Sequence, residues 1–210
     1  QLPDLPKFFQ EAAEKVSAPD PALSPSDLGG AKALGGEAGL DEEAAKKRGR
    51  QIHLLLEHLA DEPESQWQDL APRILDNSGE GSDGWTELLA EAAQVLTKPD
   101  LQHLFEPETL AEVSLTAKLG AQKLHGTIDR LIITETEVLA VDFKTNAVVP
   151  ESSDQVPEGL LRQMGAYAHA LGQIYENKTI RTALLWTKTA QIMPLPETLI
   201  TEALRNVYAP

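Results

Sequence analysis

The chain has 210 residues, of which 41% are hydrophobic and 24% are charged, and these proportions are typical of a globular domain. No apolar run approaches the roughly 18 residues that a membrane span requires. Cysteine is absent, which excludes disulfides, thiol catalysis and cysteine-ligated zinc or iron–sulfur sites. The first four residues, Gln1 to Asp4, contain no initiator Met and no signal-peptide pattern, so we expect an internal piece of a longer protein.

The formal net charge of −15 is unevenly distributed. Residues 61–110 carry 2 basic and 12 acidic groups, whereas residues 111–210 carry 9 and 11. The total argues against non-specific binding to a polyanion, because phosphate contacts need Lys and Arg. Since the rest of the chain is nearly balanced, a local basic groove remains compatible with the sequence, and we expect the acidic segment to face away from any DNA.

The first half of the chain is expected to be irregular and then helical. Residues 1–40 contain several Pro and Gly residues and are expected to be a linker or an irregular N-terminal segment, apart from a short helix at 8–16. Apolar residues at three- and four-residue spacing then predict helices at 41–60, 64–75 and 85–96.

The second half alternates with a period of two and is expected to form a sheet. Strands are expected at 112–119, 123–134, 138–143, 179–187 and 192–193, and helices at 160–175 and 197–208. The helix between the third and fourth strands is a crossover, so part of the sheet is expected to be parallel. The fold class is therefore α/β or α+β, with a mixed central β-sheet flanked by helices. We expect one domain at 41–210, with a helical part at 41–108 and a sheet core at 110–210.

Two carboxylates and a lysine form the most informative cluster. A hairpin can bring Asp129 and Asp142 together on neighbouring strands, and the strand period places Lys144 on the same face as Asp142. Two adjacent carboxylates repel each other unless a cation lies between them, and such oxygen ligands suit Mg²⁺ or Mn²⁺. A lysine beside them can stabilise phosphoryl charge. An Asp-x-Lys at a strand end is also common as a solvated ion pair.

Three further features fit a site between helix and sheet. His53 lies at the edge of the apolar stripe of the 41–60 helix, where it is either a metal ligand or a boundary histidine. Gln163 and Tyr167 are four residues apart, so they share a helix face and can brace the lysine or contact phosphate. Lys46, Lys47, Arg48 and Arg50 can contact phosphates or form a solvated helix face.

Taken in order, four motifs resemble a known family. They are Gly49-x-x-x-His53, Gly126-x-x-Asp129-Arg130, Asp142-x-Lys144-Thr145 and Gln163-x-x-x-Tyr167. This set resembles the RecB-like branch of the PD-(D/E)XK nuclease superfamily, over about residues 24–190. More narrowly, it looks like the C-terminal nuclease domain of AddA-type helicase–nuclease subunits, which act in bacterial double-strand-break repair. The resemblance implies a restriction-endonuclease-like core.

The resemblance also implies roles for individual residues. The metal ligands would be His53, Asp129, Asp142 and the backbone carbonyl of Phe143, with Lys144 as the catalytic lysine. Gln163 and Tyr167, and around them Arg130, Thr145, Arg48 and Arg50, would support the site or contact DNA. Glu112 sits where relatives often carry a strand glutamate. The expected cofactor is Mg²⁺ or Mn²⁺, and no iron–sulfur cluster is expected.

The implied activity is exonuclease-type hydrolysis of a DNA strand that a helicase delivers. The partners would be single-stranded DNA, helicase domains of the same full-length chain and an AddB-like subunit, in the cytoplasm and without a membrane. One alternative is an inactive nuclease-fold module that binds DNA ends or docks a partner. Another is a plain α/β domain with a chance cluster of ion pairs.

Overall fold

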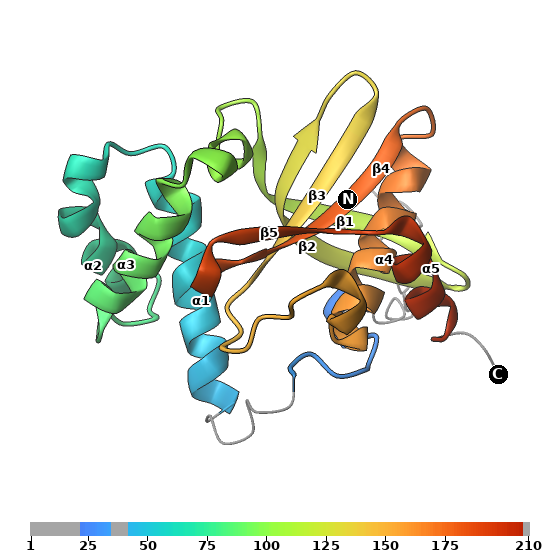
Figure 1. Ribbon diagram of the computed structural model, residues 1–210, viewed down its shortest axis with the longest axis horizontal. Coiled ribbons are helices and arrows are strands. Elements are labelled where there is room, and N and C mark those ends of the chain that lie inside the picture. Colours follow the sequence, from blue (N-terminus) through green and yellow to red (C-terminus); the bar gives the residue numbers. More distant parts are fainter. Residues whose placement is uncertain (1–21, 35–41, 208–210) are drawn as a thin grey trace, which may run out of the picture.

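A five-stranded mixed sheet forms the centre of the protein, with helices on both of its faces (Figure 1). The computed structural model describes residues 22–34 and 42–207. The strands lie in the order of the sequence: β1 (Leu110–Leu119), β2 (Gln122–Ile133), β3 (Glu137–Lys144), β4 (Thr179–Trp186) and β5 (Gln191–Leu195). Only β3 and β4 are parallel, and the other neighbours are antiparallel. The mixed sheet that the sequence predicts is therefore confirmed.

Two groups of helices cover the two faces. The first group is α1 (Glu42–Leu59), α2 (Trp67–Asn77) and α3 (Trp85–Leu96), with short 3₁₀ segments at Glu64–Gln66 and Pro99–Leu104. The second is α4 (Glu158–Ile174) and α5 (Glu197–Arg205). Short 3₁₀ turns lie at Pro25–Asp27, Ser153–Gln155 and Thr187–Thr189. None of the helices in the described part of the chain is both long and apolar enough to cross a membrane.

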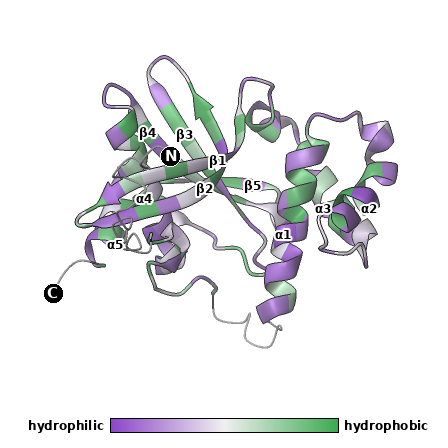
Figure 2. Ribbon diagram, turned by 180° about the vertical axis from the view of Figure 1, so that it is seen from behind, coloured by the Kyte–Doolittle hydropathy of each residue, from purple (hydrophilic) through white to green (hydrophobic). Residues whose placement is uncertain are grey.

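The sheet separates two apolar cores, which explains the near-continuous apolar run in β3. Val138 and Ala140 point to the α4 side, whereas Val141 and Phe143 point to the α1 side. Burying a large apolar side chain contributes about 1.5–3 kcal/mol, so a strand buried on both faces is held firmly in register. Hydrophilic and hydrophobic residues alternate around the helices in Figure 2, as expected of helices with one buried side.

The ladder between β1 and β2 is distorted where Glu112 faces Asp129. Glu112 has a φ of 49°, in the left-handed region that non-glycine residues rarely adopt. Along β2 the alternation also changes there, since Ile128 and Leu131 lie in the same core although they are three residues apart. The distortion turns the Asp129 carboxylate toward α1.

The segment 22–34 packs on the domain although the sequence suggests a linker. The backbone N–H of Leu23 donates to the carbonyl of Lys123 at 2.7 Å, and the N–H of His125 donates to the carbonyl of Leu23 at 2.9 Å. Leu28 is buried in the core on the α4 side. The expected helix at 8–16 lies outside the described residues.

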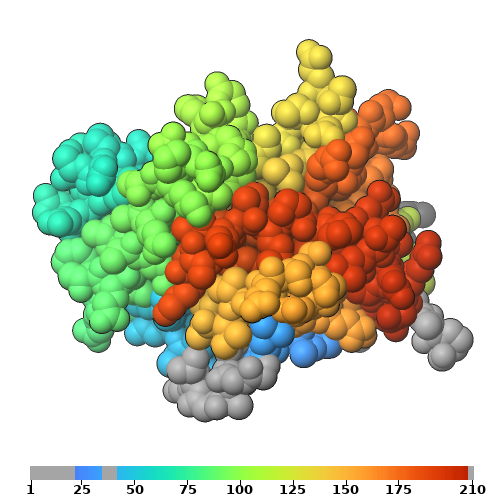
Figure 3. All heavy atoms as spheres, viewed as in Figure 1, coloured from blue at the N-terminus to red at the C-terminus, as the bar shows by residue number. Residues whose placement is uncertain are grey.

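Most predicted elements are confirmed within a few residues. The helices expected at 41–60 and 85–96 correspond to α1 and α3, and the crossover helix expected at 160–175 corresponds to α4. The helix expected at 64–75 begins with a 3₁₀ turn and continues as α2, which accommodates Pro72. The space-filling view shows β5 and α5 side by side, above the loop that connects β3 to α4 (Figure 3).

Candidate active site

The lysine and the second carboxylate meet at the end of β3, as the strand period predicts. The ammonium of Lys144 forms an ion pair with Oδ2 of Asp142, which is buried. Gln163 of α4 donates from Nε2 to Oδ1 of Asp142 at 2.9 Å and accepts from the Lys144 ammonium through Oε1 at 3.2 Å. One amide group therefore fixes both charged side chains, and the ammonium has little freedom to leave the site.

Tyr167 secures this arrangement to β2. Its hydroxyl donates to the carbonyl of Thr127 at 2.6 Å and accepts from Nε2 of Gln163 at 3.3 Å. Burial, with the nearby charge of Asp142, raises the pKa of the Tyr167 phenol, which therefore stays protonated and remains a donor. The four-residue spacing on α4 thus gives the bracing geometry that the sequence suggests.

His53 reaches from α1 to the first carboxylate. Its Nδ1 lies 3.2 Å from Oδ1 of Asp129, and its Nε2 lies 3.2 Å from the carbonyl oxygen of Phe143. The N–H of Phe143 donates to Oδ2 of Asp129 at 2.5 Å. Both imidazole nitrogens face oxygen acceptors, so the protonated imidazolium suits this geometry. The backbone of Phe143 joins Asp129 and His53 to the strand that carries Asp142 and Lys144.

The electrostatics of these groups follow from burial and proximity. Burial alone would lower the pKa of His53, but the charge of Asp129, the hydrogen bond to it and the charge of Asp142 together outweigh burial and raise that pKa. Burial alone would raise the pKa of Asp129, but the charge of His53 and the hydrogen bonds to it lower that pKa. Burial raises the pKa of Asp142, despite the opposing charge of Lys144.

Glu112 joins the site through the distorted step of β1. Within the described residues, one ligand atom each from His53, Glu112 and Asp129 lies within 4.8 Å of the others, close enough to hold one metal ion. Burial, with the charge of Asp129, raises the pKa of Glu112 to about 7. A carboxyl group with such a raised pKa stays partly protonated at neutral pH, and a bound cation would stabilise its ionised form.

The donor set fits a hard divalent cation. Two carboxylates and a neutral imidazole match the ligands of Mn²⁺, and the oxygens also suit Mg²⁺. The family resemblance implies that Asp142 and the Phe143 carbonyl belong to this set, and it places Glu112 only where relatives often carry a strand glutamate. In the structure Asp142 is engaged by Lys144 and Gln163, whereas Glu112 lies beside His53 and Asp129. No residue pattern reveals a positive φ, so before the structure only the family resemblance pointed to Glu112.

The predicted DNA-contacting arginines are engaged by other groups. Arg48 pairs with Glu91 of α3, and the Nε of Arg50 donates to Oε1 of Glu80 at 2.6 Å. Arg130 is buried, with its guanidinium 4.9 Å from the ring centroid of Phe105. In the structure, Arg48 and Arg50 of α1 are therefore paired with acidic residues rather than part of an unpaired basic patch. The acidic residues that neutralise it are distant in sequence, so composition alone could not identify them.

Thr145 lies beside α1 rather than in the cluster around Lys144. Its hydroxyl oxygen is 3.3 Å from the position that a Cβ on Gly49 would occupy. Gly49 therefore lets α1 approach the end of β3 closely, one turn before His53. The Gly49-x-x-x-His53 motif thus has a packing reason as well as a chemical one.

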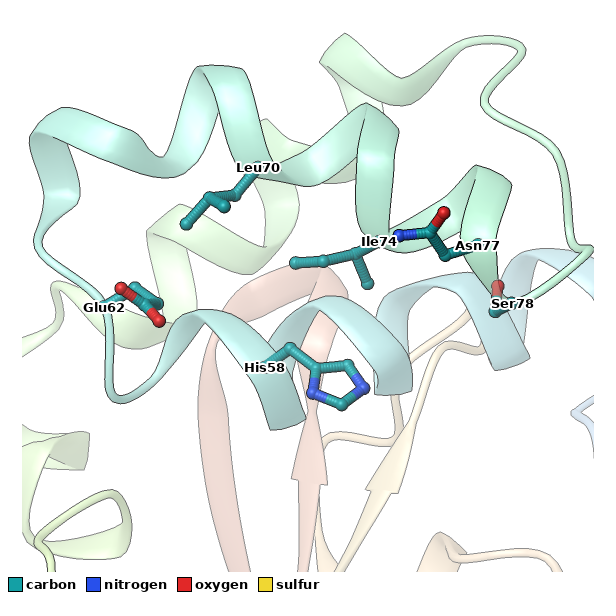
Figure 4. A pocket seen from close by; sticks show the side chains of 6 residues that line it. All are labelled: His58, Glu62, Leu70, Ile74, Asn77 and Ser78. Carbon is teal, nitrogen blue, oxygen red and sulfur yellow. The ribbon is translucent and has the colours of Figure 1, made fainter.

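Two adjoining hollows run along α1. The first, of about 440 Å³, is lined by His53, Glu112, Arg50, Glu80 and neighbours that include Ser78. The second, of about 480 Å³, shares Ser78 and lies between α1 and α2 (Figure 4). The first hollow gives a substrate access to the exposed side of the His53–Glu112–Asp129 group.

A family model and one solved structure agree with this fold. Residues 26–202 match the family described as PD-(D/E)XK nuclease superfamily. The solved structure of a protein named "Putative exonuclease", from Eubacterium rectale, is 16% identical with a TM-score of 0.52, over 80% of this chain and 64% of that protein. The structure of SSO0001 is 13% identical over 92% of this chain and 78% of that one, with a TM-score of 0.37. No curated protein sequence matches.

Fold and site together define an α/β domain with a lysine beside acidic groups at the ends of its central strands. The family match extends over most of the chain. The chain therefore belongs to the PD-(D/E)XK nuclease superfamily.

Proposed function

We propose that the chain is a metal-dependent DNA nuclease domain that hydrolyses phosphodiester bonds in exonuclease fashion. One observation carries the proposal: the backbone of Phe143 holds Asp129 and His53 directly beside the strand residues Asp142 and Lys144. A metal-capable group and a fixed ammonium thus share one rigid strand. The name of the structural neighbour from Eubacterium rectale supports an exonuclease.

The residues divide the chemistry between them. His53, Glu112 and Asp129 would hold the divalent cation, which supplies a Lewis acid for a phosphoryl oxygen and for the attacking water. Lys144, kept in place by Gln163, can donate to a phosphoryl oxygen as negative charge builds up. Asp142 forms an ion pair with that ammonium and orients it. This distribution places positive charge where the transition state is most negative.

The setting we propose is a RecB-like nuclease domain of an AddA-type helicase–nuclease, acting in bacterial double-strand-break repair in the cytoplasm. Support comes from the ordered motifs around His53, Asp129, Lys144 and Gln163. In that setting, helicase domains of the same protein would deliver single-stranded DNA, and an AddB-like subunit would be the partner. Assembly with purified subunits of that type, measured by co-elution, tests the setting independently of cutting.

A DNA-binding or docking module without cutting activity is the second candidate. The pairing of Arg48 and Arg50 with acidic residues favours its docking form, because these two cations are engaged and fewer are left to hold DNA for cutting. The intact contacts of Lys144 with Asp142 and Gln163 favour the nuclease instead. A decayed site would not need to retain this buried charge, which costs desolvation.

End-labelled single-stranded DNA and its circular form separate these functions. With Mn²⁺ or Mg²⁺ we expect the linear strand to be shortened from an end, the circle to resist, and EDTA to stop the reaction. Binding of the labelled strand without any cutting, at saturating metal and high protein concentration, would contradict the nuclease and support the docking module.

A further inference from the structure

A carboxylate pairs with a guanidinium in the hollow beside the metal-capable group. Arg50 donates from Nε to Oε1 of Glu80 at 2.6 Å and from Nη2 to Oε2 at 3.3 Å. This two-point geometry is the one in which arginine binds either a carboxylate or a phosphate. Arg50 and Glu80 line the same hollow as His53 and Glu112.

The basic residues on this side of α1 form a line toward the metal-capable group. Lys47, Arg50 and His53 are spaced by three residues, so they share one face of the helix. The Lys47 ammonium lies 3.7 Å from the position that a Cβ on Gly81 would occupy, next to Glu80. Lys47 and Arg50 thus both lie near Glu80, and Arg50, which lines the first hollow, is one helical turn from His53.

The loop that carries Glu80 is held independently of this ion pair. Gln51 is buried and donates from Nε2 to the carbonyl of Gly81 at 2.9 Å. The Arg50 side chain, by contrast, remains 54% exposed. Because Gln51 anchors the loop backbone, the carboxylate can leave Arg50 without the loop unfolding. An exposed ion pair is also weak enough for a competing anion to replace it.

We propose that Arg50, together with Lys47, is a binding subsite for a backbone phosphate of the DNA strand, and that Glu80 occupies this subsite until substrate displaces it. The proposal rests on the proposed function and adds a substrate contact and a built-in competitor to it. A phosphate bound there would lie in the same hollow as the metal-capable group. Glu80 thereby lowers affinity for DNA while keeping Arg50 in its binding geometry.

The test is binding of a fluorescein-labelled oligodeoxythymidylate to the 210-residue chain, followed by anisotropy with Ca²⁺ in place of Mg²⁺. Glu80→Gln is expected to tighten binding about twofold to fivefold, as for release of an exposed ion pair. Arg50→Gln is expected to weaken binding and to reduce the slope of log K against log salt by about 0.7, one single-strand phosphate contact. When Arg50→Gln is already present, adding Glu80→Gln is expected to change the affinity for the oligonucleotide little.

Asp83→Asn is the matched control, since it removes the same charge from an exposed position in the same loop. Equal tightening by Asp83→Asn and Glu80→Gln would overturn the proposal, because the effect would be general repulsion. The proposal would also be overturned if Glu80→Gln still tightened DNA binding when Arg50→Gln was present. The same holds if Glu80→Gln, with unchanged circular dichroism, did not tighten DNA binding at all. Wild-type cutting is measured separately. Tightening through Arg50 without any cutting would leave the subsite standing and refute the nuclease.

Discussion

His53 of α1 lies with its Nδ1 3.2 Å from Oδ1 of Asp129 on β2, and this contact joins the helical layer to the sheet. The other imidazole nitrogen lies against the Phe143 carbonyl, so the ring is fixed at both ends. A cation bound by one nitrogen would replace the proton and the contact on that nitrogen, while the contact of the other nitrogen would still hold the ring in place. The contact therefore connects the packing of α1 on the sheet with the chemistry of the site.

Metal binding should depend on Glu112 as well as on His53. We expect His53→Ala and Glu112→Gln each to weaken Mn²⁺ binding about tenfold or more, because each removes a ligand from a three-residue group. Isothermal titration calorimetry without DNA measures this directly. Glu108→Gln, an exposed residue just before β1, is the control and should bind Mn²⁺ like the wild type. Equal Mn²⁺ affinity in Glu112→Gln and wild type would show that Glu112 is not a metal ligand.

The raised pKa of Glu112 predicts a pH-dependent stability difference. Its pKa is about 7 in the folded chain, above the usual value of 4.5, so the folded state favours the protonated form. The stability linked to that proton is present below about pH 4.5 and is lost as the pH rises through 7. In EDTA, the free energy of unfolding of Glu112→Gln should therefore rise relative to wild type between these pH values.

Denaturant titrations of both proteins across this pH range measure the difference. The effect is small because the side chain is only partly buried and solvent reaches it and screens its charge. Saturating Mn²⁺ should reverse it, since the wild type binds the cation more tightly and is therefore stabilised more by it than Glu112→Gln. A difference that is constant with pH would contradict the assignment of this pKa to Glu112.

Gln163 is expected to act on catalysis by positioning Lys144. Gln163→Leu removes the amide that contacts the Lys144 ammonium and the Tyr167 hydroxyl. The ammonium is then less firmly positioned, so we expect kcat to fall about 10–100-fold. Loss of buried hydrogen bonds should also lower stability by about 1–3 kcal/mol. Gln173→Leu, on an exposed turn of the same helix, is the control. If kcat in Gln163→Leu matched the control, the bracing role would be wrong.

Gly126 is expected to tolerate no side chain. A Cβ there would lie 2.7 Å from Cδ of Pro25 and 3.3 Å from Cε1 of Tyr167, so Gly126→Ala should cost about 1–3 kcal/mol. Gly172 of α4 has no atom within 4 Å of such a Cβ, and Gly172→Ala should add about 0.5–1 kcal/mol through helix propensity. Thermal unfolding of the two variants checks the opposite signs, and equal changes would contradict this packing.

Local patterns in the sequence were sufficient to predict the framework of the site. The period of two placed Asp142 and Lys144 together, the helical period paired Gln163 with Tyr167, and the hairpin brought Asp129 close to Phe143. Each of these relationships depends on residues that are near in sequence or on adjacent strands. Such relationships follow from backbone geometry alone.

The contacts that the sequence could not reveal are long-range or depend on backbone strain. In the sequence, Arg48 and Arg50 suggest a free basic patch. In the folded chain, Glu91 of α3 pairs with Arg48, and Glu80, in the loop after α2, pairs with Arg50. Glu112 enters the site through a positive φ that no residue pattern encodes. In both cases the tertiary arrangement decides which charges meet.

The most direct test of the central claim is the rate of DNA cutting by Lys144→Met beside wild type and Lys188→Met. Lys144 is fixed between Asp142 and Gln163, whereas Lys188 is an exposed lysine after β4. With saturating Mn²⁺ and end-labelled single-stranded DNA, we predict at least about a 100-fold loss for Lys144→Met, at unchanged Mn²⁺ affinity and circular dichroism, and a normal rate for Lys188→Met. Metal-dependent cutting by Lys144→Met at the wild-type rate would contradict the account.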